Sequence, residues 1–337
     1  IQNQKDDFTE MKKIILILQL LILVAPMSGQ VVINEYSASN LTGYTDNYQK
    51  AEDWIEIYNT GNQNINLGGY YISDDITNPT KWVIPPITII PGNGYRTFWC
   101  SGRDESFFSD IHTNFKLQQT KDTPECIVFS DPEGNIINEI EIQKTQLEHS
   151  MGRSSDGSTT WEIFTNPTRG DANTGSSYSA YAGTPAMSID AGFYNGTQIL
   201  DISTTEPISE IHYTLNGNVP YSGSTEYSGP LSISNTKVVK AIVISDDTNI
   251  LPSFITFNTY FIDESHSLPV LSTSANQLLT LLNGSQSLKP HGTIEYFDGD
   301  GIRKDFGYGE YNKHGQDSWA FPQRSFDYIA RDEMGYH

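Results

Sequence analysis

Residues 53–75 read DWIEIYNTGNQNINLGGYYISDD, in which two short apolar runs are separated by a cluster of Asn, Gly and Thr. Side chains alternate between the two faces of a strand, so Asp53 shares a face with Ile55 and Ile57, while Glu56 points the opposite way. Similar runs, separated by turn clusters such as PGNG and DPEGN, continue at the spacing of a β-sandwich. The pattern predicts a mainly β fold. It also separates the carboxylates of Asp53 and Glu56, which should therefore not act as a catalytic pair.

The composition supports the same fold class and limits the function. The chain has 337 residues, enough for two or three domains, and its 19 tyrosines and frequent Gly and Pro are typical of strands and turns. The formal net charge is -21. A surface this acidic repels phosphate backbones, so we expect no nucleic-acid partner. The acidity instead suits solubility outside the cell.

Residues 11–30, MKKIILILQLLILVAPMSGQ, place two lysines before an apolar run and small or polar residues after it. The apolar run is shorter than the roughly 20 residues that span a membrane. We therefore predict a signal peptide at 11–30 and no transmembrane span, with residues 1–10 as upstream, non-structural sequence. The pattern leaves open whether the exported protein stays in the periplasm, reaches the cell surface or enters the medium.

Cys100 and Cys126 are the only cysteines of the chain. An oxidising compartment would allow a disulfide bond between them, which would stabilise the fold by roughly 3 kcal/mol. Two buried free thiols are the alternative, and the sequence favours neither. Two cysteines without a neighbouring histidine do not make a metal site, so none is expected.

Residues 31–174 form the first predicted domain. Its separated blocks include INEYSASN, DWIEIYNTGNQNINLGGYYISDD, IIPGNGYRTFWCSG and SMGRSSDGSTTWEIFTNPTRGDANT. In order, and over the whole segment, these blocks resemble the bacterial form of the lamin tail domain. The resemblance implies an immunoglobulin-like sandwich that is an accessory module of secreted or surface proteins and has no catalytic residues. Six polar positions could share a surface site, although hydrogen bonding in turns and at strand edges is the favoured explanation: Asn34, Glu35, Asp53, Glu56, Asn59 and Asp74.

Residues 185–262 follow a small, polar linker at 175–184 and form a second predicted β-sandwich. The blocks IHYTLNGNVPYSGSTEYSGPLSI and VVKAIVI resemble the C-terminal domain of chitobiase and β-hexosaminidase enzymes. The resemblance implies an immunoglobulin-like spacer or binding module. It implies no glycosidase activity, because that chemistry lies in a different domain. His212 alternates with apolar neighbours and is expected on the solvent side of its strand.

Residues 266–337 are expected to form an incomplete α+β segment. SLPVLSTS predicts a strand, ANQLLTLLNG a short helix closed by Gly284, and GTIEYFDGDGIRKDFGYGEY a hairpin about DGDG. The continuation GYGEYNKHGQDSWAFPQRSFDYIARDEMG resembles the beginning of the spore-coat CotH family of secreted atypical kinases. That resemblance implies that Arg324 faces nucleotide phosphates and that ATP and magnesium bind only to a complete domain. The catalytic acids of the family would lie beyond His337, so no catalytic residue is expected in this chain.

Two functions follow from these patterns. The leading interpretation is an exported bacterial multi-module protein, in which two non-catalytic sandwiches space or attach a CotH-like kinase region whose catalytic residues are missing. The rival is a carbohydrate-binding or adhesive surface protein without kinase activity. In the rival, three tyrosines contact glycans, although core packing is the commoner use of such rings: Tyr213, Tyr221 and Tyr227. In both interpretations the expected partner is an extracellular or cell-surface protein or glycan.

Overall fold

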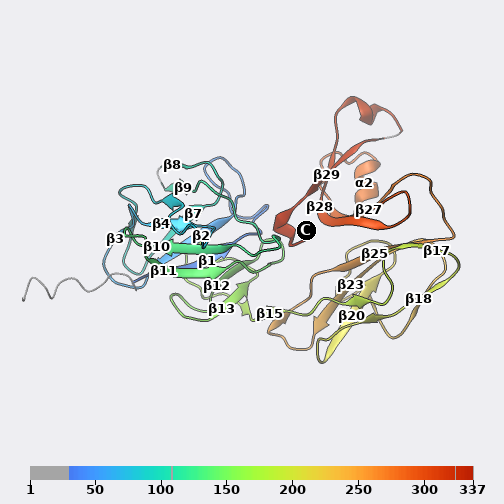
Figure 1. The fold of residues 1–337 in the computed structure, drawn as a ribbon, viewed down its shortest axis with the longest axis horizontal. Coiled ribbons are helices and arrows are strands. Elements are labelled where there is room, and N and C mark those ends of the chain that lie inside the picture. Colours follow the sequence, from blue (N-terminus) through green and yellow to red (C-terminus); the bar gives the residue numbers. More distant parts are fainter. Residues whose placement is uncertain (1–29, 108, 323, 337) are drawn as a thin grey trace, which may run out of the picture.

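The computed structural model describes residues 30–107, 109–322 and 324–336. The fold is mainly β, as the sequence predicts, and its parts follow one another along the chain (Figure 1). The predicted signal peptide at 11–30 lies outside the described residues, apart from Gln30, and so do residues 1–10.

The first part is a β-sandwich of two facing sheets. The larger sheet has the strand order β14-β13-β12-β1-β2-β7-β9-β8. Its strands are β1 (Val31–Ser37), β2 (Trp54–Asn59), β7 (Tyr95–Trp99), β8 (Glu105–Phe107), β9 (Asp110–His112), β12 (Ser150–Arg153), β13 (Trp161–Phe164) and β14 (Ser177–Tyr178). The facing sheet has the order β11-β10-β4-β5, and a separate pair joins β3 to β6. These strands are β3 (Ile65–Asn66), β4 (Tyr71–Ser73), β5 (Trp82–Val83), β6 (Ile89–Ile90), β10 (Cys126–Ser130) and β11 (Ile136–Glu141).

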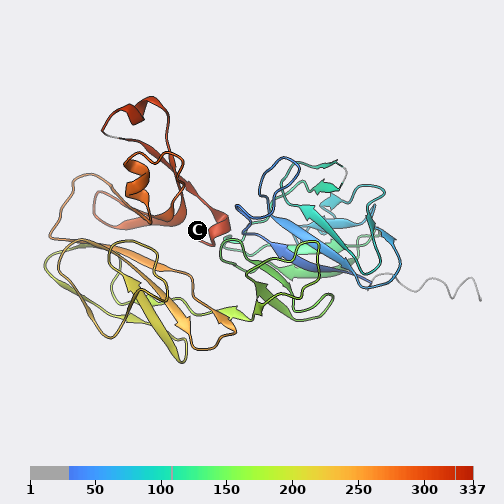
Figure 2. The same cartoon turned by 180° about the vertical axis from the view of Figure 1, so that it is seen from behind.

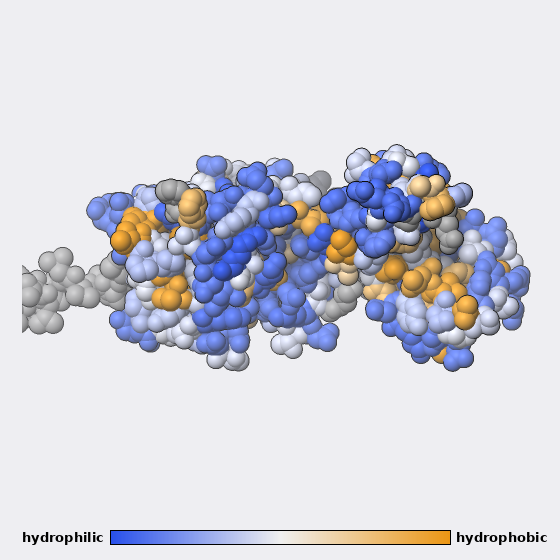
Figure 3. Space-filling view, turned by 90° about the horizontal axis from the view of Figure 1, so that it is seen from above, coloured by the Kyte–Doolittle hydropathy of each residue, from blue (hydrophilic) through white to orange (hydrophobic). Residues whose placement is uncertain are grey.

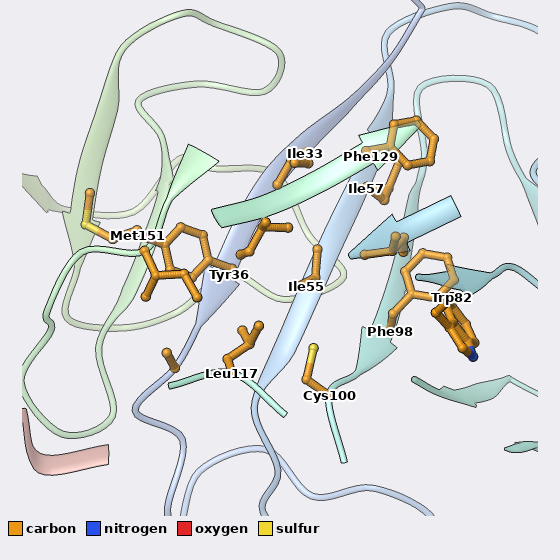
Figure 4. Close-up of a cluster of buried hydrophobic side chains, with 14 of the residues drawn as sticks. Ile33, Tyr36, Ile55, Ile57, Trp82, Phe98, Cys100, Leu117, Phe129 and Met151 are labelled. Atoms are coloured by element: carbon orange, nitrogen blue, oxygen red, sulfur yellow. The ribbon is translucent and has the colours of Figure 1, made fainter. Parts of the chain in front are cut away.

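The two sheets enclose a core of aliphatic and aromatic side chains (Figure 4). Ile55 and Ile57 of β2 point into this core, as the alternation predicts. The opposite face of β2 is also covered, because the ring of Tyr44 packs edge-on against Trp54 at 6.1 Å. Trp54 and Glu56 on that face are fully buried. Strand β2 is therefore packed on both faces, and polar side chains on its outer face need partners within the protein.

The second part is a smaller sandwich. A sheet of order β17-β25-β23-β20-β21 packs against the pairs β18-β22 and β16-β19. Its strands are β15 (Ala180–Tyr181), β16 (Ala186–Met187), β17 (Gly192–Tyr194), β18 (Gln198–Leu200), β19 (Ile202–Ser203), β20 (Ser209–Thr214), β21 (Thr225–Glu226), β22 (Leu231–Ile233), β23 (Lys237–Ser245), β24 (Ile250–Leu251) and β25 (Thr256–Ile262).

Two expectations for this part need correction. The expectation that His212 lies on the solvent side is wrong: the residue is 5% exposed, because the loop after β20 folds back and places Ser224 O 3.1 Å from its Nδ1. The residues of the predicted linker are not a free tether either. β14 pairs with β13 of the first sandwich and β15 pairs with β24 of the second, so strand pairing ties the connection to both.

The third part is an antiparallel sheet of order β26-β27-β28-β29 with one short helix. Its elements are β26 (Val270–Ala275), α2 (Leu278–Leu282), β27 (His291–Phe297), β28 (Arg303–Lys313), η2 (Asp317–Ala320), β29 (Phe326–Ala330) and η3 (Asp332–Met334). The predicted strand, helix and hairpin are all present, and Gly301 takes the positive φ of 77° that the DGDG turn requires. The helix packs on one face of this sheet, and the second sandwich lies on the other side (Figure 2).

Polar side chains join the third part to the second sandwich. Glu295 of β27 accepts hydrogen bonds from Arg303 Nη1 at 2.9 Å and from the backbone N–H of Thr259 at 3.2 Å. Lys240 of β23 is fully buried at this contact and donates to Ser274 O at 3.3 Å. Burial lowers the pKa of Lys240 to about 7. The contact therefore places ionisable groups where water is excluded.

Candidate functional site

The larger sheet of the first sandwich carries a pair of buried carboxylates on the face away from its core. A β-bulge between Ile33 and Glu35 inserts one residue, so Glu35 lies on the same face as its cross-strand neighbour Glu56. Glu35 Oε2 accepts a hydrogen bond from the Thr168 hydroxyl at 2.8 Å. Glu56 Oε2 accepts one from the backbone N–H of Gly170 at 2.6 Å. The pair thus ties β1 and β2 to the segment that follows β13.

The environment of this pair favours the protonated acids. Burial raises the pKa of Glu56 to about 8, and it also raises the pKa of Glu35 above its usual range. Glu56 Oε1 is buried and has no hydrogen-bond partner among the described residues. A protonated acid could transfer its proton, but both side chains are fully buried. The pair cannot reach a substrate, and its role is to hold the fold.

The polar positions singled out in the first sandwich do not form a surface site. Five of them are buried: Asn34, Glu35, Glu56, Asn59 and Asp74. Hydrogen bonding within turns explains them better, since Asn59 Nδ2 donates to Gln63 O at 2.7 Å and to Pro91 O at 3.0 Å. Asp53 Oδ1 is buried as well. The cross-strand neighbour of Glu56 is Glu35, which strand alternation alone does not predict, because the bulge in β1 changes the register.

A serine, a histidine and an asparagine in the first sandwich resemble a hydrolytic triad. Ser101 Oγ lies 2.9 Å from His112 Nδ1, and His112 Nε2 lies 2.8 Å from Asn47 Oδ1. The histidine is therefore held with its proton on Nε2. Ser101 is only 7% exposed and His112 is fully buried, so no substrate can approach the hydroxyl. The trio was not singled out from the sequence, since its members lie far apart, and its geometry supports a structural role.

The two cysteines are free thiols in the structure. Cys100 is buried beside the core, and Cys126 at the start of β10 is partly exposed. Burial raises the pKa of both thiols, that of Cys100 far more. Neither cysteine is therefore an activated nucleophile.

The three candidate glycan-binding tyrosines lie in different environments. Tyr213 and Tyr227 pack against the core of the second sandwich, with their rings edge to face at 6.4 Å. Tyr221 is 66% exposed. Tyr213 and Tyr221 line one shallow depression, which Tyr227 does not reach. Tyr213 therefore adjoins both other tyrosines, but only Tyr213 and Tyr221 line the same depression.

Arg324 is held by its own part of the chain. Its Nη1 donates a hydrogen bond to Leu282 O at the end of α2, and its guanidinium lies over the Trp319 ring at 5.4 Å. These contacts connect the helix to the loop before β29. A phosphate that bound Arg324 would have to displace these contacts or use the guanidinium alongside them.

Residues 332–336, which we call the C-terminal clamp, contact both sandwiches. The Asp332 carboxylate accepts hydrogen bonds from the backbone N–H groups of Gln119 at 2.8 Å and Thr120 at 3.1 Å, and from the Thr120 hydroxyl. The Gln119 side chain donates in return to Asp332 O at 3.0 Å. Charge-assisted bonds of this kind are about twice as strong as neutral ones. They fasten the third part to the first sandwich.

The clamp contacts the second sandwich through an aromatic side chain. The Tyr336 hydroxyl accepts from Ile255 N at 2.7 Å and donates to Ile255 O at 3.1 Å. Its ring packs against Phe254 at 5.9 Å and Tyr308 at 5.2 Å. Gly335 has a φ of 75°, and a Cβ there would lie 2.6 Å from the Phe254 ring. Glycine is needed at this position for both reasons.

A cavity of about 590 Å³ lies where the three parts meet. Its walls come from the second sandwich, from β27, β28 and the clamp, and from residues 146 and 147 of the first sandwich. The surface in Figure 3 is mostly hydrophilic, with apolar residues in scattered patches.

Comparison with protein families identifies two of the three parts. A model described as Lamin Tail Domain matches residues 25–144, and one described as Chitobiase/beta-hexosaminidase C-terminal domain matches residues 189–253. No curated protein matches the chain. The chain thus contains these two domains in tandem, and neither model reaches the third part.

The described residues contain no helix long and apolar enough to cross a membrane. Within the same ranges, no group of three or more His, Cys, Asp or Glu side chains is arranged to hold a metal ion.

Proposed function

We propose that this chain is an exported, non-catalytic scaffold. In it, the lamin tail domain and the chitobiase-type domain hold a CotH-like segment, residues 266–337, in a fixed position outside the cell. Export would depend on the signal peptide at 11–30. The C-terminal clamp is the observation that carries the proposal, because it binds the third part to both sandwiches at once.

The environments of the candidate catalytic groups support a non-catalytic role. Glu35, Glu56 and His112 are buried, and Arg324 is engaged by Leu282 and Trp319. Phosphoryl transfer needs cations at the phosphates and acids that hold magnesium. We propose that ATP and magnesium would bind only when a complete CotH-like domain supplies those acids.

The scaffold function is tested by releasing the clamp. Asp332→Ala removes the carboxylate that three donors of Gln119 and Thr120 share, so hydrogen exchange in residues 326–336 should rise at least about tenfold. Glu333→Ala, one residue along, is the matched control and should leave exchange unchanged. Equal exchange in wild type and Asp332→Ala would contradict the proposal.

The non-catalytic part of the proposal has its own test. The purified chain, incubated with radiolabelled ATP and magnesium, should transfer no phosphate to itself or to a generic acceptor above a no-protein control. Reproducible turnover would contradict it.

Glycan binding is a second candidate function, supported by the depression that Tyr213 and the exposed Tyr221 line together. Aromatic faces of this kind stack on sugar rings. A glycan array should then give signals that Tyr221→Ala abolishes and Tyr48→Ala, at another exposed tyrosine, preserves. A silent array would rule this function out for the glycans displayed.

A further inference from the structure

We propose that the cavity at the junction of the three parts is a binding site for an uncharged, largely apolar small molecule. The cavity of about 590 Å³ is within the size range of small-molecule sites in proteins. Apolar and aromatic side chains from two parts of the chain face it, among them Ile242, Ile244, Phe254, Tyr221, Tyr308 and Tyr336. An apolar ligand would remove these surfaces from water.

The charge of the cavity selects against ionic ligands. None of the described residues that line it is Lys, Arg, Asp or Glu, although the chain as a whole carries a formal charge of -21. His291 is the one lining side chain that titrates near neutral pH; burial lowers its pKa, and its Nε2 lies 4.0 Å from Glu310 Oε2, behind the cavity wall. A charged ligand would lose its hydration without gaining a counter-charge. The ligand is therefore uncharged.

The polar groups at the cavity are largely used by the protein itself. Gln146 Nε2 donates to Pro252 O at 2.9 Å and to Ser253 O at 3.2 Å. The Ser253 hydroxyl donates to Phe254 O at 2.8 Å and accepts from Val243 N at 2.9 Å.

The Tyr336 hydroxyl likewise both donates to and accepts from the backbone of Ile255. A sugar, with a hydroxyl on almost every carbon, would leave many groups unpaired here. The site thus differs in chemistry from the depression beside Tyr213, although Tyr221 borders both. The Tyr308 hydroxyl and the His291 ring can serve one polar group on an otherwise apolar ligand.

Two fluorescent probes that differ by one charge provide the test. N-phenyl-1-naphthylamine is uncharged, and 8-anilino-1-naphthalenesulfonate carries the same rings with a sulfonate. Titration of the full chain is done in about 0.5 M salt, which screens the long-range repulsion between the sulfonate and the acidic protein. The neutral probe should bind saturably with one site per chain, and the sulfonate at least about tenfold more weakly.

Ile244→Trp fills the cavity from a half-buried position and should weaken the neutral probe at least about tenfold. Ile199→Trp, at an exposed isoleucine of the same sandwich, should bind as wild type does. Tyr221→Ala removes an exposed loop side chain, so it should not disturb folding. It should also weaken binding of the neutral probe.

Near-UV circular dichroism tests whether each variant is folded. If Ile244→Trp does not fold, binding of the neutral probe to Tyr221→Ala is the test of the site. Absence of saturable binding by the neutral probe would overturn the proposal. So would equal affinity for the sulfonate, or unchanged binding in both cavity variants.

Discussion

The first sandwich and the third part are both β structures, but they are stabilised in different ways. The first sandwich encloses a large apolar core between its own two sheets. The third part has a small core under α2, and its other contacts are made with its neighbours through Glu295, Lys240 and the C-terminal clamp. The first sandwich is therefore stabilised mainly by its own core. The third part depends for its order on contacts with the two sandwiches. Four measurements test this contrast, taken from the largest expected effect to the smallest.

Phe129→Ala should cause the largest loss, because Phe129 is fully buried in the core of the first sandwich and stacks on Tyr70 at 5.6 Å. We expect the free energy of unfolding to fall by about 3–5 kcal/mol. Urea denaturation measures the loss, and Ile136→Ala, at an exposed position of β11, should change it little. A loss below about 1 kcal/mol would mean that this core does not carry the stability of the sandwich.

Glu56→Gln should change how the first sandwich responds to pH. The folded pKa of Glu56, about 8, is above the ordinary value of 4.5. The stabilisation that the protonated Glu56 gives the folded state is therefore fully present below pH 4.5 and is lost as pH rises through about 8. In that window stability should fall by up to about 1.4 kcal/mol per pH unit, and the glutamine variant should lack this fall. Thermal melts between pH 5 and 9 measure the difference. Glu139→Gln, at an exposed carboxylate of β11, should behave as wild type does, and parallel curves for wild type and Glu56→Gln would refute the assignment.

Lys240→Met should reveal the opposite slope at the contact between the second and third parts. The folded pKa of Lys240, about 7, is below the ordinary value of 10.5. The stabilisation that the neutral Lys240 gives the folded state is therefore present above pH 10.5 and is lost as pH falls through about 7. Wild type should therefore gain stability from pH 7 to 10, and Lys240→Met should not. The shift is as large as that of Glu56, so the slope should reach the same limit of about 1.4 kcal/mol per pH unit, with the opposite sign. Lys237→Met on the same strand is the control, and a pH profile shared by all three proteins would contradict the prediction.

A reducing agent should have the smallest effect. Both cysteines are free thiols in the structure, so the reductant should leave the melting temperature unchanged, whereas a bridge would give a loss of roughly 3 kcal/mol. A thiol reagent should modify the partly exposed Cys126 before the buried Cys100. A marked drop in melting temperature with reductant would show instead that the oxidised protein is bridged.

Local sequence patterns were enough to predict most secondary structure. The alternation around Ile55 and Ile57 placed their core face correctly, and DGDG marked the hairpin whose turn needs Gly301 in a left-handed conformation. Prediction was wrong at His212, because alternation along one strand cannot tell whether a distant loop covers the outer face. The loop ending at Ser224 does so here.

The candidate sites were harder to predict because their parts are distant in sequence. Asp332 and Gln119 are separated by 213 positions, and no local pattern distinguishes this aspartate from its acidic neighbours. Within the clamp, Gly335 is the residue whose role the local sequence indicates, because a glycine there can take the positive φ that ends η3. Tyr221 was considered for its ring, but the sequence contains nothing that places it near Tyr213 or beside a cavity.

The sequence alone determined the fold class and the identity of the two sandwich domains, because strand periodicity, turn residues and family-typical blocks are local properties of the chain. Only the tertiary structure decided which carboxylates share a face, which thiols and tyrosines are accessible, and where the three parts border a common cavity. Those outcomes depend on a β-bulge in β1, on the docking of residues 332–336 and on the packing of separate sheets. Burial and proximity are set by contacts between distant segments, and these contacts decide which polar groups keep their charge and which surfaces remain open to a ligand.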